Sequence, residues 1–214
     1  MGRKKKYDVS ELVEAQFESG SRSGVLKNLL HIKSTAEINR AEALALKQAE
    51  DACFRTYDKN YRFAAKDICN IHKLWLGKIY SWAGHYRQVN ISKGGFNFAA
   101  AAHIPQLMQE FEKSLLSKFT PCNFEGRHFI VQALAEVHVE FILIHPFREG
   151  NGRIARLLAT IMALQAGLPP LDFTIVRGKK KQEYFSAVRA GLKRDYKPME
   201  KIFNEILEKT TSHP

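Results

Sequence analysis

Residues 145–156 have the sequence His-Pro-Phe-Arg-Glu-Gly-Asn-Gly-Arg-Ile-Ala-Arg, and apolar segments flank them on both sides. Pro146 cannot continue a helix and biases His145 away from helical geometry, so the apolar run before it is predicted to be a helix that stops at His145. Beyond this stretch apolar residues recur at helical spacing. That pattern predicts a second helix from about Gly150 to about Gln165.

The start of the second helix has the composition of an anion-binding site. Gly150 and Gly152 bracket Asn151, and glycines allow backbone N–H groups to converge on an anion. Free N–H groups and the dipole of a helix N-terminus favour phosphate there. Arg153 and Arg156 are three residues apart, so we expect them to share one side of the first turn and to bind phosphate oxygens in pairs.

Two more side chains complete a predicted reactive site. Glu149 is the only carboxylate in the stretch, and beside a polyphosphate its expected role is to hold Mg²⁺. His145, with an ordinary pKa of roughly 6.5, could accept a proton from an incoming hydroxyl. Together these groups predict phosphoryl or nucleotidyl transfer. The chain has no Walker A motif and no kinase Gly-rich loop, which excludes those enzyme classes.

Simpler interpretations exist for single residues. The whole stretch could be a helix corner with a buried histidine and two surface arginines, but twelve residues of these types in this order disfavour that interpretation. His138 lies seven residues before His145 on nearly the same helix face, which suggests a metal pair. Since the sequence offers no third ligand, we expect His138 to be a hydrogen-bonded core residue instead.

The stretch resembles the signature of the Fic family, His-Pro-Phe-x-(Asp/Glu)-Gly-Asn-Gly-Arg-x-x-Arg, at every fixed position. Members of that family mostly transfer AMP from ATP to a hydroxyl side chain of a protein and release pyrophosphate. The resemblance implies an all-α Fic-fold bundle with a β-hairpin flap over the active site. It also implies these roles: general base for His145, Mg²⁺ ligand for Glu149, anion hole for Gly150, Asn151 and Gly152, and distal-phosphate contacts for Arg153 and Arg156.

A β-hairpin is predicted where apolar and polar residues alternate on both sides of Lys93-Gly94-Gly95. It could be an ordinary surface hairpin. The preceding run from Trp82 to Arg87 resembles, however, the Trp-Ala-Gly-x-x-Arg run that leads into the Fic flap, which lays the target segment down by strand pairing. By position the flap is residues 91–98, and the residues expected to touch target or nucleotide are Ile91, Lys93, Gly94 and Phe98. Tyr184 resembles a family tyrosine near the adenine pocket, although a packing role is equally consistent with its position.

Helical periodicity predicts the rest of the bundle, with helices over residues 34–54, 64–80, 104–118, 127–144, 184–192 and 198–206. The resemblance covers about residues 64–205 of a helical domain predicted over 34–209. Residues 1–33 form an N-terminal extension that is a candidate regulatory segment. Residues 210–214 are expected to be a frayed tail.

Regulation is suggested by the N-terminal extension. Fic proteins are often held inactive by a helix bearing Ser/Thr-x-x-x-Glu-Gly/Asn, whose glutamate pairs with the second signature arginine. Residues 10–15 match this pattern except that Ala15 occupies the last position, which makes Glu14 a candidate inhibitory residue for Arg156. Glu14→Gly would then raise activity several-fold. Otherwise a separate small antitoxin-like protein or a homodimer would supply the inhibition.

Composition limits the compartment and the partners. The chain has 214 residues, is 45% hydrophobic, and contains neither an apolar run of 18 residues nor a secretory signal, so we expect a globular protein without a membrane segment. Cys53, Cys69 and Cys122 lack metal spacing and are expected to be reduced core thiols of a cytoplasmic protein, in its own cell or in a cell to which it is delivered.

The net charge of +11 permits nucleic-acid binding, but part of it lies in two short runs, residues 3–6 and 179–181, that are more typical of solvated ends and loops. Three functions therefore remain: a protein adenylyltransferase that uses ATP and Mg²⁺, a Fic-like transferase of another nucleotide or phosphate-containing group, and a basic binding module with an inactive site. The intact His145 argues against the third function.

Overall fold

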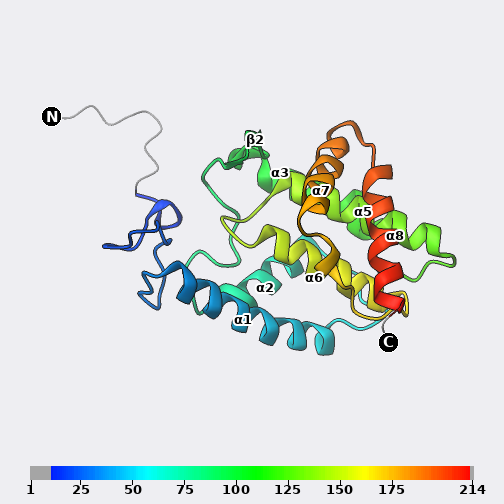
Figure 1. The fold of residues 1–214 in the computed structure, drawn as a ribbon, viewed down its shortest axis with the longest axis horizontal. Coiled ribbons are helices and arrows are strands. Elements are labelled where there is room, and N and C mark those ends of the chain that lie inside the picture. Colours follow the sequence, from blue (N-terminus) through cyan, green and yellow to red (C-terminus); the bar gives the residue numbers. More distant parts are fainter. Residues whose placement is uncertain (1–10, 213–214) are drawn as a thin grey trace.

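The structure is a computed structural model that describes residues 11–212. Two helices, α5 (Arg127–Ile144) and α6 (Asn151–Gln165), run through the middle of the molecule (Figure 1). Most of their side chains are buried, and α5 is apolar on nearly every face, as expected for a helix that others surround. The connection between them, residues 145–150, places the signature stretch close to the centre of the bundle.

Two pairs of helices cover this central pair. On one side α1 (Thr35–Thr56) and α2 (Ala65–Leu76) pack against each other and against α6, and on the other side α7 (Lys179–Ala190) and α8 (Lys197–Ser212) pack against each other and against α5 (Figure 1). Two 3₁₀ turns flank α7, namely η4 (Phe173–Ile175) and η5 (Gly191–Lys193). The all-α class is confirmed.

The predicted helix over residues 104–118 is present, although it is not uniform. It begins after the 3₁₀ turn η2 (Ala101–His103) as α3 (Ile104–Phe111), continues through the π-helical η3 (Glu112–Leu116), and ends as α4 (Ser117–Phe119). A π-helical turn within an α-helix is a local insertion that hydrophobic periodicity does not reveal.

The predicted hairpin is also present, with short strands. β1 (Ser92–Lys93) pairs antiparallel with β2 (Phe96–Asn97), and Gly94 and Gly95 form the turn. Both glycines have positive φ, at 55° and 74°, which is the conformation of a tight hairpin turn. The alternation of residue types therefore located the turn correctly but predicted longer strands.

Residues 11–33 pack on one end of the bundle, next to the start of α1 (Figure 1). The segment contains the 3₁₀ turn η1 (Val13–Ala15) and an antiparallel bridge between Phe17 and Leu26. Val25 and Leu26 are buried in the core, and the buried side chain of Asn28 holds the turn that follows them through hydrogen bonds to backbone groups. This extension is therefore part of the packed structure.

Two helix ends differ from the prediction. α2 stops at Leu76 because Gly77, a poor helix former, follows it, and the chain continues to Tyr80 in turns. α8 runs to Ser212, although residues from Thr210 onward were expected to be frayed. Thr210 is buried and its hydroxyl accepts the Asp172 N–H at 2.9 Å, which ties the last turn to the chain before η4. Residues 1–10, 213 and 214 lie outside the described part of the chain.

Within residues 11–212, no helix is at once long and apolar enough to cross a membrane. The three cysteines, Cys53, Cys69 and Cys122, are free and buried, as predicted.

Candidate active site

His145 ends α5 in a conformation that exposes one side of its ring. Its backbone is left-handed, with φ 52° and ψ 58°, while its N–H still bonds to Phe141 O at 3.0 Å. Ring Nδ1 lies 3.2 Å from Ile142 O, and since a carbonyl can only accept, Nδ1 carries the proton. Nε2 is left with its lone pair, which is the tautomer that a general base requires.

The surroundings of His145 keep it neutral. Its ring stacks on Phe98 of the flap, with centroids 3.7 Å apart. Burial, together with the nearby positive charges of Arg87 and Lys93, lowers the pKa of His145 to about 4. The imidazole is therefore unprotonated at neutral pH and able to accept a proton.

The N-terminus of α6 offers backbone N–H groups beside His145. Gly150 precedes the helix with φ 86°, and its carbonyl accepts the N–H groups of Arg153 and Ile154, both at 3.0 Å. The first-turn N–H groups of Asn151 and Gly152, which have no carbonyl one turn earlier in the helix, are the ones open to an anion. The Asn151 side chain is buried and forms two hydrogen bonds with the Phe147 backbone, at 2.9 and 2.8 Å. These bonds hold the turn before α6 in place. We call residues 150–153 at the start of this helix the candidate anion cradle.

The two signature arginines diverge, although their spacing suggested a shared side. Arg153 Nη1 forms an ion pair of 2.7 Å with Glu42 Oε2 of α1, and its guanidinium lies over the Trp75 ring at 4.4 Å. Arg156 is exposed to solvent and lies close to Glu50 and Tyr184. Arg153 thus has a carboxylate partner within the fold, while Arg156 opens onto a cavity.

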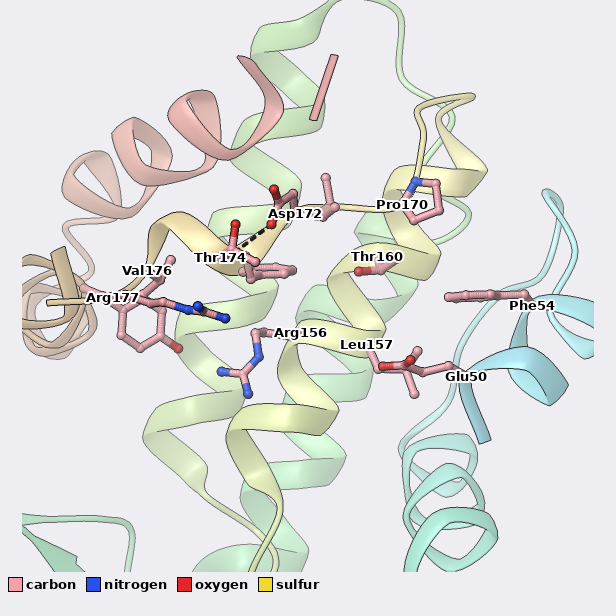
Figure 2. Close-up of a pocket in the computed structure, with 13 residues that line it drawn as sticks. Glu50, Phe54, Arg156, Leu157, Thr160, Pro170, Asp172, Thr174, Val176 and Arg177 are labelled. Atoms are coloured by element: carbon pink, nitrogen blue, oxygen red, sulfur yellow. Dashed lines mark hydrogen bonds between the residues drawn. The ribbon is translucent and has the colours of Figure 1, made fainter. Parts of the chain in front are cut away.

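That cavity has a volume of about 550 Å³ and lies between α1, α6, α7 and the segment before α7 (Figure 2). Figure 2 shows Arg156 and Arg177 on one wall, with Glu50 and Phe54 of α1 on the opposite wall. Tyr184 also lines the cavity. A ligand that reaches Arg156 from here would meet both cationic and anionic side chains.

Glu149 lies just before the cradle, and its side chain is exposed, with Arg148 Nη1 at 3.9 Å. Its backbone is fixed by His72 of α2. The Gly84 N–H donates to His72 Nδ1 at 2.8 Å, so the ring proton is on Nε2, which donates to Glu149 O at 3.1 Å. The same ring stacks on Phe147 with centroids 3.9 Å apart. His72 thus connects the Trp82–Arg87 run to the signature.

The remaining predicted residues are found around this centre. Phe98 N–H bonds to Ile91 O at 3.2 Å and extends the flap pairing, while Lys93 and Gly94 are exposed near its tip. The Tyr184 hydroxyl lies 2.7 Å from His138 Nε2. His138 Nδ1 faces Ala155 O at 3.3 Å, so His138 is a hydrogen-bonded core residue, as expected.

Glu14 occupies a different place from the one that its inhibitory role requires. Its Oε1 accepts the N–H groups of Gln88 and Val89, at 2.6 and 3.1 Å, in the segment that leads into the flap. The carboxylate whose charge acts on Arg156 is that of Glu50. Ser10, the first residue of the inhibitory pattern, lies outside the described residues.

Sequence reasoning assigned no role to Glu42, His72 or Arg87. Glu42 could have been noticed, because it interrupts the buried stripe of α1 that Ile38 and Ala49 define. His72 gave a weaker signal as a single polar residue on the apolar face of α2. Their partners in the signature stretch are distant in sequence, 77 residues for His72 and Glu149 and 58 residues for Arg87 and His145, and such contacts have no local pattern.

Comparison with known proteins agrees with this geometry. The model of the Fic/DOC family matches residues 62–163. A protein adenylyltransferase Fic from Aedes aegypti is 29% identical over 158 residues, which are 72% of this chain and 29% of the relative. Its counterpart from Drosophila melanogaster is 30% identical over 150 residues, which are 68% of this chain and 28% of the relative. The chain thus spans less than a third of the length of these curated relatives.

Solved structures share the fold over nearly the whole chain. BepC, a translocated effector protein of Bartonella tribocorum solved with bound AMPPNP, superposes with a TM-score of 0.74 at 21% identity, covering 92% of this chain and 97% of that one.

Proposed function

This chain is a Fic-domain protein, and on that premise we propose that it transfers AMP from ATP to a hydroxyl group of a target protein. The observation that carries the proposal is the state of His145, a neutral imidazole with Nδ1 bound to Ile142 O and Nε2 unoccupied. It lies between the flap residue Phe98 and the N-terminus of α6. A base between a strand-forming surface and an anion cradle suits an attack of a protein hydroxyl on a phosphate.

The proposed reaction uses these groups in order. The phosphates of ATP bind the N–H groups of Asn151 and Gly152 at the start of α6. The flap pairs with a target strand and presents a Tyr, Thr or Ser hydroxyl. His145 Nε2 accepts the hydroxyl proton as the oxygen bonds to the α-phosphorus and the bond to pyrophosphate breaks. Arg153, Arg156 and the helix dipole stabilise the charge of the leaving pyrophosphate.

Glu149 is the residue that would hold Mg²⁺ in this reaction. Its carboxylate is exposed beside the cradle and its backbone is fixed by His72, so it fits an ion that takes one protein carboxylate together with phosphate oxygens and waters. When bound, Mg²⁺ supplies positive charge to the phosphates. Tyr184, held by His138 at the edge of the cavity, is proposed to border the nucleotide.

The proposal extends to partners and compartment. The target is a protein with an accessible hydroxyl, and the free thiols are consistent with a cytosol, of the producing cell or of a recipient cell. Because Glu14 is engaged at the flap, an inhibitor of Arg156 would be a separate small antitoxin-like protein or a second copy of the chain. Nucleic acid and membranes are not proposed as partners.

The test is incubation of the purified protein with Mg²⁺ and ATP, with and without cell lysate, followed by mass spectrometry. We expect wild-type protein to add the mass of one AMP to itself or to lysate proteins, and His145→Ala to add none while it unfolds at the same temperature. Transfer that persists in His145→Ala would contradict the proposed base. Transfer of a group other than AMP, when other nucleoside triphosphates are supplied, would favour the alternative Fic-like transferase.

A further inference from the structure

Glu14 is buried, with 7% of its surface exposed, in the turn η1. Its Oε1 accepts two consecutive backbone N–H groups, those of Gln88 and Val89, at 2.6 and 3.1 Å. These residues belong to the segment that leads into the flap. The backbone carbonyl of Glu14 also accepts Arg148 Nε at 2.9 Å, which links the same turn to the signature stretch.

Arg87 lies beside this contact and is almost fully buried, with 1% of its surface exposed. Its guanidinium donates to Val89 O at 2.7 Å and to Ala99 O at 2.6 Å, and these two residues flank the flap on either side. It also donates to His145 O at 2.7 Å and to Ile144 O at 3.3 Å. One side chain therefore joins the residues on both sides of the flap to the backbone of the catalytic histidine.

The charge of Arg87 needs compensation, because all four of these hydrogen-bond acceptors are neutral carbonyls. A buried cation without a nearby anion is costly. Glu14 supplies the compensating charge from outside the helical bundle, and its carboxylate raises the pKa of Arg87 against the lowering effect of burial. Each residue thus makes the burial of the other less costly, and both bind the backbone of the segment that leads into the flap.

We propose that Glu14 is a positioning residue of the transfer reaction, which fixes the base of the flap against Arg87 so that a target hydroxyl lies opposite His145. This inference rests on the proposed function. It gives the N-terminal extension a role opposite to inhibition, because loss of Glu14 would loosen the flap and slow transfer. Within the described residues, the hydrogen bonds of Glu14 involve Gln88, Val89 and Arg148 and not residues 150–153, so nucleotide binding would be spared.

The experiment compares Glu14→Ala and Glu14→Gln with wild type in the full chain. Glu18→Ala is the matched control, because Glu18 lies in the same segment and its carboxylate also accepts a backbone N–H, that of Asn28 at 2.8 Å, away from the flap. Three quantities are measured: hydrogen exchange of residues 88–99, the affinity for AMPPNP with Mg²⁺, and AMP transfer to the chain itself and to lysate proteins.

We expect Glu14→Ala to exchange at least tenfold faster at residues 88–99 and to transfer AMP at least tenfold more slowly, with an AMPPNP Kd within twofold of wild type. Glu14→Gln, which keeps an acceptor oxygen without the charge, should lie between the two, and Glu18→Ala should match wild type in all three. Faster transfer by Glu14→Ala would overturn the inference and establish Glu14 as a brake. Unchanged exchange would overturn it as well.

The outcomes separate this inference from the proposed function. If wild type transfers no AMP to any protein, the proposed function fails, and the exchange data alone decide whether Glu14 anchors the flap. If wild type transfers AMP while Glu14→Ala loses AMPPNP affinity in proportion to its loss of transfer, the proposed function stands. The positioning role would then be overturned in favour of general damage to the site.

Discussion

At the scale of single residues, the ion pair of Arg153 shows that a signature arginine can support the fold as well as the reaction. Glu42 is almost fully buried and also accepts the Tyr80 hydroxyl at 2.7 Å, whereas the Arg153 side chain is 29% exposed. Loss of transfer on mutation of Arg153 would therefore not by itself prove a phosphate contact. The difference in exposure makes a prediction about stability.

We predict that Arg153→Ala destabilises the protein more than Glu42→Gln does. Arg153→Ala leaves the buried carboxylate of Glu42 without its cationic partner, which lowers the free energy of unfolding by about 3–5 kcal/mol. Glu42→Gln leaves the guanidinium of Arg153, which can reach solvent, and lowers it by about 1–2 kcal/mol. The double variant should be more stable than Arg153→Ala alone, because a neutral amide is cheaper to bury than a charge. Urea unfolding of the three variants measures this, and strictly additive effects would contradict it.

Local spacing in the sequence was enough to propose roles for neighbouring residues, whereas contacts with distant partners could not be predicted. His145, Glu149 and the glycines on either side of Asn151 are adjacent in sequence, so their spacing alone suggested the base, the metal ligand and the cradle. The inhibitory hypothesis for Glu14 used a short pattern, and matches to such a pattern by chance are common. In the structure Glu14 contacts Gln88, 74 residues away, and the sequence contains no trace of that pairing.

At the scale of elements, the start of α6 depends on one close approach. Gly150 has φ 86°, and a Cβ there would lie 2.5 Å from a ring carbon of Trp75 in α2. Position 150 therefore requires glycine for two reasons: its backbone is left-handed, and a larger side chain would prevent α6 from packing against α2. The anion cradle and the packing of two helices share this residue.

Gly150→Ala should for this reason be far more damaging than Gly167→Ala at the other end of α6. Gly167 also has positive φ, at 76°, but nothing lies within 4 Å of its added Cβ, so only backbone strain of about 1 kcal/mol is expected. At Gly150 overpacking adds about 1–3 kcal/mol and displaces the cradle. Thermal unfolding and AMPPNP affinity of Gly150→Ala and Gly167→Ala test this prediction. If both variants lose the same stability, or if Gly150→Ala binds AMPPNP like wild type, the Trp75 side chain can move aside without loss of stability or of the site, and the prediction is wrong.

Helices were the best-predicted elements, because their apolar stripes are long. The continuous apolar run of α5 and the periodicity of α6 fixed the central pair to within about two residues. The π-helical η3 and the two-residue strands were missed in detail, since they depend on packing beyond their own sequences. The C-terminal turn of α8 was missed because its anchor, Asp172, lies in another segment.

At the scale of the whole molecule, histidines buried as neutral rings make the fold sensitive to acid. Burial lowers the pKa of His72 to about 4 and that of His138 to about 3, and both rings are bonded in neutral tautomers to partners on other elements. In the unfolded chain each would titrate near roughly 6.5. Between that value and about pH 4 the unfolded state therefore binds more protons than the folded state.

His145, whose pKa is also lowered to about 4, adds to this effect. We predict that the free energy of unfolding has its full value above about pH 7 and falls by about 3–4 kcal/mol per pH unit between pH 6 and pH 4.5, with about a third of the loss from each of His72, His138 and His145. Urea unfolding at intervals of half a pH unit measures the slope. His128→Gln is the control, because His128 is exposed and should leave the slope unchanged. His138→Gln places an amide that does not titrate between Ala155 O and the Tyr184 hydroxyl. This variant should be less stable than wild type at pH 7, but it should lose stability with only about two thirds of the wild-type slope. If His128→Gln and His138→Gln both show the wild-type dependence of unfolding free energy on pH, the prediction is wrong. The buried histidine rings would then bind protons in the folded state, and carboxylates would determine the stability of this protein in acid.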